Sequence, residues 1–197
     1  HLFDIYQSKN HSVIVCVVDA SNLSRNLFFT SQVIEFGVPV IIVLNMMDRV
    51  RKRNLNINIK ELKKIINVSD VIPICATTKE GLDCLESAIY KVGTEHFIYQ
   101  DQPLYLPEMV NRELKPINNF LTSNYNYSIQ LASSTSIRLV ASQDYSDFFI
   151  RNMIVNQNEL KEIINNARKN FTNTEQIEAQ YRYEWLDSIF DNKLITE

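Results

Sequence analysis

The chain of 197 residues is long enough for one or two domains with a hydrophobic core. Its 45% hydrophobic and 22% charged residues are typical of a globular protein, and its net charge of −3 gives no reason to expect binding to nucleic acid. No apolar run approaches the roughly 18–20 residues of a membrane helix, and no signal peptide is visible. Three cysteines without a C-x-x-C pair and three scattered histidines argue against a disulfide framework and a histidine-based metal site.

Short apolar runs alternate with amphipathic helical patterns in the first half of the chain. The expected strands are residues 13–18, 40–44 and 71–74, and the expected helices are residues 23–36, 59–66 and 82–92. Ser21 or Asn22 is expected to cap the first helix, and Pro73 places the third strand near an edge of the sheet. Strands and helices in this order predict an α/β fold with a parallel sheet of about three strands.

The strongest functional candidate is the segment of residues 39–48. A buried strand ends abruptly in Asn45, Met46, Met47 and Asp48, and ligands bind at the carboxyl ends of strands in parallel α/β sheets. The Asp48 carboxylate could accept hydrogen bonds from N1–H and N2–H of guanine, the Asn45 amide could face N7 and O6, and a methionine between them could lie on the ring. The simpler interpretation is a strand followed by a turn.

A second polar segment follows the next strand. Cys75, Ala76 and Thr77 come directly after residues 71–74, and the carboxyl ends of successive parallel strands lie at the same edge of a sheet. The backbone amides around Ala76 could therefore meet the exocyclic oxygen of a purine while Asp48 holds its opposite edge.

Glycine is scarce in this chain. Gly37, Gly81 and Gly93 are the only three, and none lies in a phosphate-binding G-x-x-x-x-G-K-[ST] or a G-x-G-x-x-G pattern. We therefore expect these 197 residues to contain no loop able to cradle phosphates.

A basic cluster follows Asp48. It consists of Arg49, Arg51, Lys52 and Arg53. Such a cluster could meet a phosphate or an acidic partner, but a solvated loop is the favoured interpretation.

The second half of the chain has helical periodicity in place of strand patterns. Residues 93–107 are expected to be a connector, and Pro116 is expected to kink the first helix after it. We predict a partial α/β domain over residues 1–94 and an all-α domain over residues 95–197. The apolar stripes that predict these helices are Val110/Leu114/Ile117/Leu121, Ile137/Val140, Tyr145/Phe148/Phe149, Leu160/Ile163/Ala167/Phe171 and Ile177/Tyr181/Trp185/Ile189.

Three motifs carry a resemblance to a known family. Residues 17–23 (V-V-D-A-S-N-L), residues 25–27 (R-N-L) and residues 45–48 (N-M-M-D) closely resemble the G domain of the bacterial ferrous iron transport protein B (FeoB) family. In that family N-M-M-D replaces the N-K-x-D of other GTPases. Cys75 departs from the serine of the family's guanine-specificity loop, which puts the contribution of that loop in question.

The resemblance implies a guanine-nucleotide site. Its residues in this chain would be Asn45, Met46, Asp48, Cys75, Ala76 and Thr77. The ligand would be GTP or GDP, with Mg²⁺ bound only in the longer parent protein. The phosphate loop, the switch segments and the D-x-x-G element of the family would precede Val13, and the membrane permease would follow the chain. We therefore expect no catalytic or metal-binding residues here, weak or absent nucleotide binding, and no GTP hydrolysis by this chain alone.

The resemblance covers the second half more weakly. Residues 105–108, 135–139 and 176–183 are similar to the helical domain that follows the G domain in the family. Such a domain implies the permease as a partner, a place on the cytoplasmic face of the bacterial inner membrane, and GTP use coupled to Fe(II) uptake in the parent.

The family's sheet order implies an open edge. With only the last three strands of a 2-3-1-4-5-6 sheet, residues 13–18 would expose an apolar edge that could pair with another chain or with a missing portion of the parent. Two alternatives stay open: a non-catalytic interaction module with a degenerate GTPase fold, and a fragment of a translation or ribosome-assembly GTPase.

Overall fold

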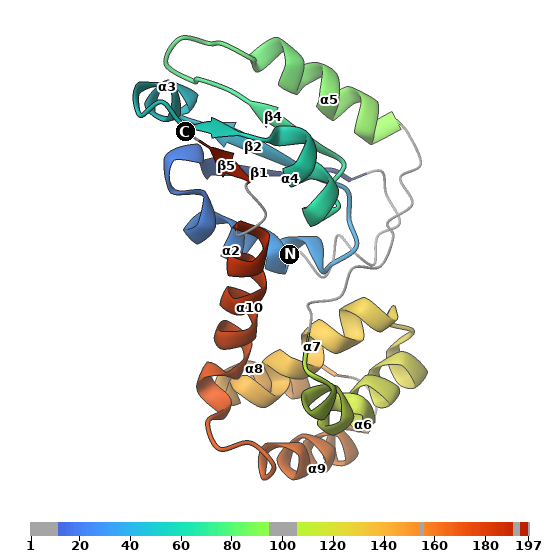
Figure 1. Ribbon diagram of the computed structural model, residues 1–197. Helices are drawn as coiled ribbons and strands as arrows, with labels where there is room; N and C mark the ends of the chain where they lie inside the picture. Colours follow the sequence, from blue (N-terminus) through green and yellow to red (C-terminus); the bar gives the residue numbers. More distant parts are fainter. Residues whose placement is uncertain (1–11, 95–105, 154–155, 191–193, 197) are drawn as a thin grey trace. The chain divides into compact units, whose positions relative to one another are not determined.

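The computed structural model describes residues 12–94, 106–153, 156–190 and 194–196 (Figure 1). The chain divides into two compact units: residues 1–100 together with 186–197, and residues 101–185. The predicted boundary between residues 94 and 95 lies beside a stretch outside the described residues and stays a prediction. None of the helices in the described ranges is both long and apolar enough to span a membrane.

The first unit contains the predicted parallel sheet. Strands β1 (Ile14–Asp19), β2 (Val40–Asn45) and β4 (Asp70–Pro73) run parallel in the order β1-β2-β4. Ile14 pairs with Val40 and Asp19 with Asn45, so β1 and β2 end level with each other. The α/β fold class expected from the sequence is confirmed, and β4 lies at the sheet edge where Pro73 can be accommodated.

Strand β2 is the buried centre of this sheet. Its residues from Val40 to Leu44 are 0% exposed, because helices cover both faces. Helix α5 (Leu82–Thr94) packs on one face, and α2 (Leu23–Ile34) and α4 (Ile59–Ile66) lie on the other (Figure 1). The core under α5 consists of Ile41, Val43, Ile72, Ile74, Ala88 and Val92.

The start of α2 differs from the sequence-based expectation. A short 3₁₀ turn, η1 (Ala20–Asn22), precedes the helix, and the Asn22 side chain makes no capping hydrogen bond. Asp19 takes this role instead, since its Oδ1 accepts hydrogen bonds from the backbone N–H of Ser21 at 2.8 Å and from its hydroxyl at 2.7 Å.

Helix α5 buries a narrower face than its apolar pattern predicts. Ala88 and Val92 are buried, whereas Leu82 and Ile89 are each 39% exposed. The sheet beneath α5 has three strands within the described residues.

Two short strands were not predicted. Strand β3 (Asn56–Ile57) follows helix α3 (Met47–Lys52), and β5 (Ile195–Thr196) pairs antiparallel with it. The backbone N–H of Asn58 also donates to the Leu194 carbonyl at 2.9 Å. The end of the chain therefore returns to the first unit.

The second unit is all helical, as expected. Helix α7 is its centre, because ten of its residues are buried and it contacts α6, α8 and α9. Helix α6 continues without a break through Pro116. The helices are α6 (Glu108–Tyr125), α7 (Ile129–Ala141), α8 (Gln143–Arg151), α9 (Gln157–Arg168) and the part of α10 (Thr174–Phe190) up to residue 185.

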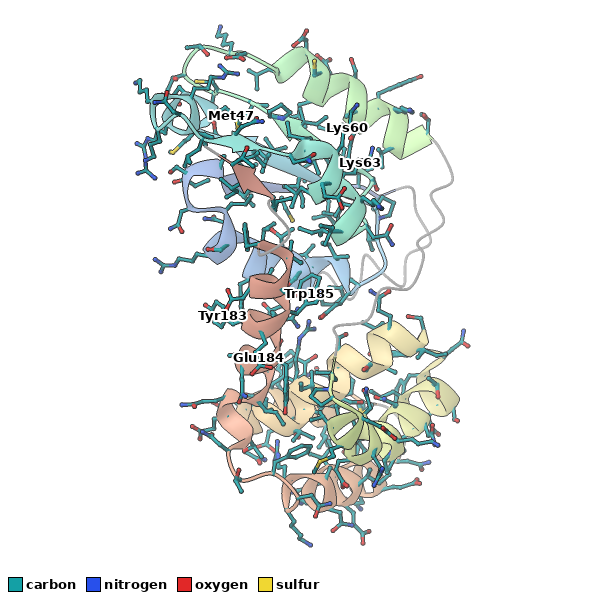
Figure 2. The ribbon with its side chains drawn as sticks, viewed as in Figure 1. Met47, Lys60, Lys63, Tyr183, Glu184 and Trp185 are labelled. Carbon is teal, nitrogen blue, oxygen red and sulfur yellow. The ribbon has the colours of Figure 1, made fainter. Side chains whose placement is uncertain are left out.

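Two helices differ from the prediction in some of their buried residues. In α8, Ser146 and Ile150 are buried while Phe148 is 63% exposed. In α10, Ile177 and Ile189 are buried as predicted, but Arg182 is buried as well, while Tyr181 and Trp185 are only partly buried (Figure 2). The Arg182 guanidinium donates to Glu178 at 3.0 Å, and that carboxylate also accepts from Arg138 at 3.3 Å. A buried arginine is therefore accommodated by an ion pair on its own helix.

Candidate functional site

The structure brings the two predicted polar segments together. Asn45 ends β2, and residues 75–77 follow β4 directly, so both lie at the carboxyl edge of the sheet. The Asn45 Oδ1 accepts hydrogen bonds from the backbone N–H of Met46 at 2.8 Å and of Ala76 at 3.2 Å. One side chain thus links the two segments.

This geometry refines the role predicted for Asn45. Its oxygen already accepts two backbone hydrogen bonds, which orients the carboxamide. Among the described residues its Nδ2 has no hydrogen-bond partner. Nδ2 is a donor, so it is the atom suited to the N7 or O6 acceptors of a purine.

Met46 and Asp48 flank a buried residue at the start of α3. Met46 is in the left-handed region with φ 63°, which turns the chain from β2 into α3. Met47 is buried beneath it, and its N–H donates to the Ile74 carbonyl at 3.3 Å (Figure 2). Asp48 lies in the first turn of α3, and its side chain is 40% exposed. The carboxylate is therefore accessible on a short, well-anchored helix.

The segment after β4 is a closed loop of residues 75–80. The Cys75 N–H donates to the Glu80 carbonyl at 3.0 Å, and the Thr78 N–H donates back to the Cys75 carbonyl at 3.2 Å. Ala76 and Thr77 are exposed on this loop, whereas Cys75 is buried at its base. The backbone N–H groups of Cys75, Ala76 and Thr78 all donate within the protein.

Cys75 is close to the Asp48 carboxylate. Its Sγ lies 3.7 Å from Asp48 Oδ1 and 3.2 Å from the Thr77 hydroxyl. Hydrogen bonds from Thr77 and Thr78 hold the pKa of the Cys75 thiol below its usual value. A thiol can thus occupy this position while the loop keeps its backbone hydrogen bonds.

The basic cluster of residues 49–53 lies mostly on helix α3. The sequence favours a solvated loop here, so this expectation is corrected. The members of the cluster point to different acceptors. Arg51 forms two hydrogen bonds with Glu80, Lys52 lies 3.7 Å from Asp48, and Arg53 donates to the Ser21 carbonyl at 3.4 Å. The Arg51–Glu80 pair was missed at the sequence level, because recognising it requires knowing that Arg51 is helical.

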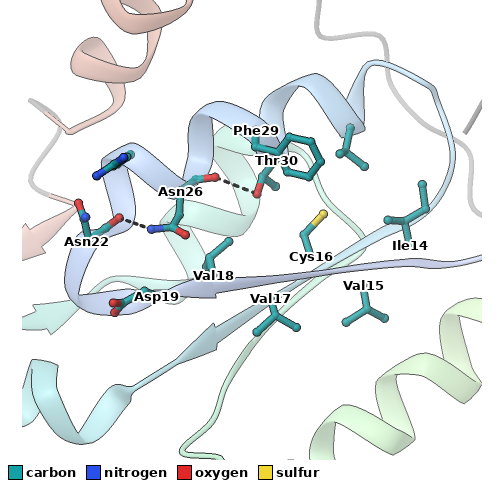
Figure 3. A pocket seen from close by; sticks show the side chains of 12 residues that line it. Ile14, Val15, Cys16, Val17, Val18, Asp19, Asn22, Asn26, Phe29 and Thr30 are labelled. Atoms are coloured by element: carbon teal, nitrogen blue, oxygen red, sulfur yellow. Dashed lines mark hydrogen bonds between the residues drawn. The ribbon is translucent and has the colours of Figure 1, made fainter.

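A groove of about 600 Å³ runs along β1 and α2, apart from residues 45–48 and 75–80 (Figure 3). Cys16 points towards α2, whereas Val15 and Val17 point to the opposite face of the sheet. Within the described residues β1 pairs only with β2, and Val17 and Phe29 are 62% and 63% exposed. The open edge predicted for residues 13–18 is thus lined by apolar side chains.

Comparison with known proteins identifies one family. Residues 3–89 match the family "Ferrous iron transport protein B". The Fe(2+) transporter FeoB of Escherichia coli K12 is 39% identical over 100 residues, which are 49% of this chain and 13% of that protein. The chain therefore spans about one eighth of the curated relatives that it matches.

Solved structures extend the similarity to nearly the whole chain. The cytosolic domain of L. pneumophila FeoB superposes with a TM-score of 0.76 at 23% identity, covering 99% of this chain and 72% of that one. A variant of S. thermophilus NFeoB bound to GDP superposes with a TM-score of 0.75 at 25% identity, covering 96% and 71%. The predicted resemblance to ferrous iron transport protein B is therefore confirmed, in sequence for the first half of the chain and in fold for almost all of it.

Proposed function

We propose that this chain is the guanine-reading and helical portion of the cytosolic region of a FeoB-like ferrous iron transporter. In the complete protein it would bind GTP or GDP, with Mg²⁺ held by other segments, and would couple nucleotide hydrolysis to Fe(II) uptake. Its place would be the cytoplasmic face of the bacterial inner membrane, next to the permease.

One observation carries the proposal. The hydrogen bond from the Ala76 N–H to Asn45 Oδ1 holds residues 45–48 and 75–77 at one edge of the sheet. Asn45 Nδ2 and the Asp48 carboxylate then offer a donor and an acceptor to a flat ring. A guanine base presents the complementary groups, because its N7 and O6 accept hydrogen bonds while N1–H and N2–H donate them. The GDP bound to the S. thermophilus relative supports the same ligand class.

The chain by itself is proposed to be inactive in hydrolysis. Phosphoryl transfer depends on positioning the phosphates and Mg²⁺, and none of the three glycines lies in a phosphate-loop pattern. Met46 also stands where other GTPases carry a lysine, so a cation is missing beside the base. Both features favour weak holding of nucleotide.

Isothermal titration of the chain with GDP and GTP tests this part. We expect no binding in the micromolar range, and no phosphate release in a hydrolysis assay. A micromolar dissociation constant would contradict the proposed inactivity.

The base-reading role is tested in the full-length protein, where Asp48→Asn should remove the preference for GTP over ATP, because the amide cannot accept both guanine hydrogen bonds.

The open edge of β1 is proposed to pair with another strand. A second copy of this chain and an N-terminal portion of the longer protein are the two candidate partners, and an apolar unpaired edge is a template for either. Val17→Lys places a charge on this edge and should shift light scattering towards the monomer. Met109→Lys, at a 77% exposed site on α6, is the matched control and should leave the mass unchanged. A strictly monomeric wild-type chain would refute pairing between copies.

A further inference from the structure

We infer that Arg51 and Glu80 are positioning residues, which set the 75–80 loop in register with Asp48. The inference rests on the proposed function, because it concerns the same base-reading site. Neither residue belongs to the motifs that the sequence singles out for contact with the base.

The two side chains form a forked ion pair between separate elements. Arg51 Nη1 donates to Glu80 Oε2 at 2.8 Å, and Nη2 donates to Oε1 at 2.5 Å. Arg51 lies in the last turn of α3, while Glu80 closes the loop that follows β4. A pairing with two parallel hydrogen bonds fixes orientation as well as distance. It therefore constrains the direction in which the loop leaves the sheet.

Helix geometry relates this pair directly to Asp48. Asp48 and Arg51 are three residues apart on α3, so they lie on the same face of the helix. Asp48 approaches Cys75 at the beginning of the loop, and Arg51 holds Glu80 at its end. Cys75 and Glu80 in turn pair through their backbones. The four residues form a closed frame, in which the ion pair links the end of α3 to the end of the loop.

The loop and the end of β4 have few other attachments to β2 and α3. Asn45 holds the beginning of the loop through the Ala76 N–H, and Met47 holds the end of β4 through Ile74. Ala76, Thr77, Thr78 and Lys79 are exposed between these points and Glu80. Without the ion pair, the end of the loop would be held only through the backbone pairing of Cys75 with Glu80 and the start of α5, and the Ala76 N–H would then leave Asn45 more often.

The charges of the pair depend on each other. The Arg51 guanidinium lowers the pKa of the Glu80 carboxyl, and Glu80 raises the pKa of Arg51. Both side chains are about half exposed, at 56% and 50%. Solvent screens such a pair, so its contribution is expected in local order and not in global stability.

The test uses the full 197-residue chain and two independent readouts. Arg51→Gln and Glu80→Gln each remove one charge. The double variant Arg51→Glu/Glu80→Arg restores an ion pair with the two charges swapped between the positions. Lys63→Gln is the matched control, because Lys63 makes a partly exposed ion pair with Asp70 at 2.9 Å at the other end of β4 (Figure 2).

Hydrogen exchange of the Ala76 amide is the first readout. We expect it to be about two- to fivefold faster in either single variant, the range for losing an exposed ion pair. The charge exchange should recover part of the protection, and Lys63→Gln should leave it unchanged. Unchanged exchange of the Ala76 amide in both single variants would overturn the inference, whatever the result of the GMP binding experiment.

Binding of GMP, followed by NMR shifts of the Asn45 and Ala76 amides at millimolar ligand, is the second readout. We expect the affinity for GMP to fall by a similar factor in the single variants, with AMP as the control ligand. Faster Ala76 exchange with unchanged GMP affinity would refute the positioning role. If GMP shifts neither amide in the wild-type chain, the chain does not bind guanine without the rest of the protein, and the exchange data still decide whether the ion pair fixes the loop.

Discussion

At the scale of single residues, the candidate site depends on backbone conformations as much as on side chains. Met46 adopts a positive φ without being glycine, and Gly81 closes the 75–80 loop with φ 81°. A Cβ at Gly81 would overlap the Pro73 carbonyl oxygen and lie 3.2 Å from the Ile74 side chain. Gly81 therefore permits the loop to return against the strand that it leaves.

Replacing Gly81 by alanine should destabilise the first unit by about 2–4 kcal/mol, because positive-φ strain adds to a backbone clash. Gly37→Ala is the matched comparison, since Gly37 has φ 69° but nothing within 4 Å of the added Cβ. Its cost should be about 1 kcal/mol, from conformational strain alone. Urea denaturation of both variants measures the difference, and equal costs would contradict the clash.

The candidate residues could be named from sequence, but their hydrogen bonding could not. Asn45 and Asp48 stand out because a buried apolar strand ends abruptly in two polar groups. That Asn45 accepts a hydrogen bond from Ala76, thirty-one positions away, depends on how β2 and β4 align. The Arg51–Glu80 pair depends in addition on α3 being a helix, and six residues carry too little periodicity to show this.

At the scale of secondary-structure elements, α7 ends in an unusual way. Arg168 of α9 donates to the carbonyl oxygens of Leu139 at 2.5 Å and Val140 at 3.0 Å. It also reaches the Ser142 carbonyl at 3.2 Å and the Gln143 side chain. Burial lowers the pKa of Arg168, yet arginine stays charged at neutral pH. One guanidinium thus satisfies the last carbonyls of the central helix, which would otherwise lack partners.

Arg168→Ala should lower the free energy of unfolding of the helical unit by about 2–4 kcal/mol, because buried carbonyl groups lose charged donors. Arg168→Lys should recover only part, since an ammonium cannot reach several acceptors in a fork. Lys169→Ala is the control, because Lys169 is exposed and donates only to Asn166 among the described residues. A loss of less than 0.5 kcal/mol in Arg168→Ala, within the range of ordinary surface substitutions, would contradict the capping role.

The sequence predicts the elements better than their buried faces. The sheet strands and the long helices could be predicted, because continuous apolar runs and apolar residues at helical spacing directly indicate burial. The burial of Arg182 could not be predicted, because a charged residue is expected to be exposed unless its ion-pair partner, here Glu178, is known. The strands β3 and β5 have two residues each, which is too short for any alternation to be detected.

At the scale of the whole molecule, the first unit is discontinuous in sequence. Residues 186–197 belong with residues 1–100, and the helical unit lies between them along the chain. Leu194 is 0% exposed and its carbonyl accepts from Asn58, while Ile195 pairs with Ile57. A short terminal segment is thus part of the α/β unit's structure.

Leu194→Ala should destabilise the first unit by about 2–4 kcal/mol, the cost of emptying a fully buried leucine site. Hydrogen exchange of β2 amides should become faster, while α7 amides in the helical unit should keep their protection. Thr196→Ala, at an exposed position of β5, should change neither. Faster exchange in α7 as well would show that the two units open together.

The pairing of β3 with β5 also has a consequence for synthesis on the ribosome. Residues 12–94 leave the ribosome before the helical unit, but β3 acquires its partner only after that unit has been made. The α/β unit therefore cannot form its β3–β5 pairing until about a hundred further residues have been synthesised. Domains generally fold as units in order of synthesis. We expect the helical unit to reach its final packing before the α/β unit does.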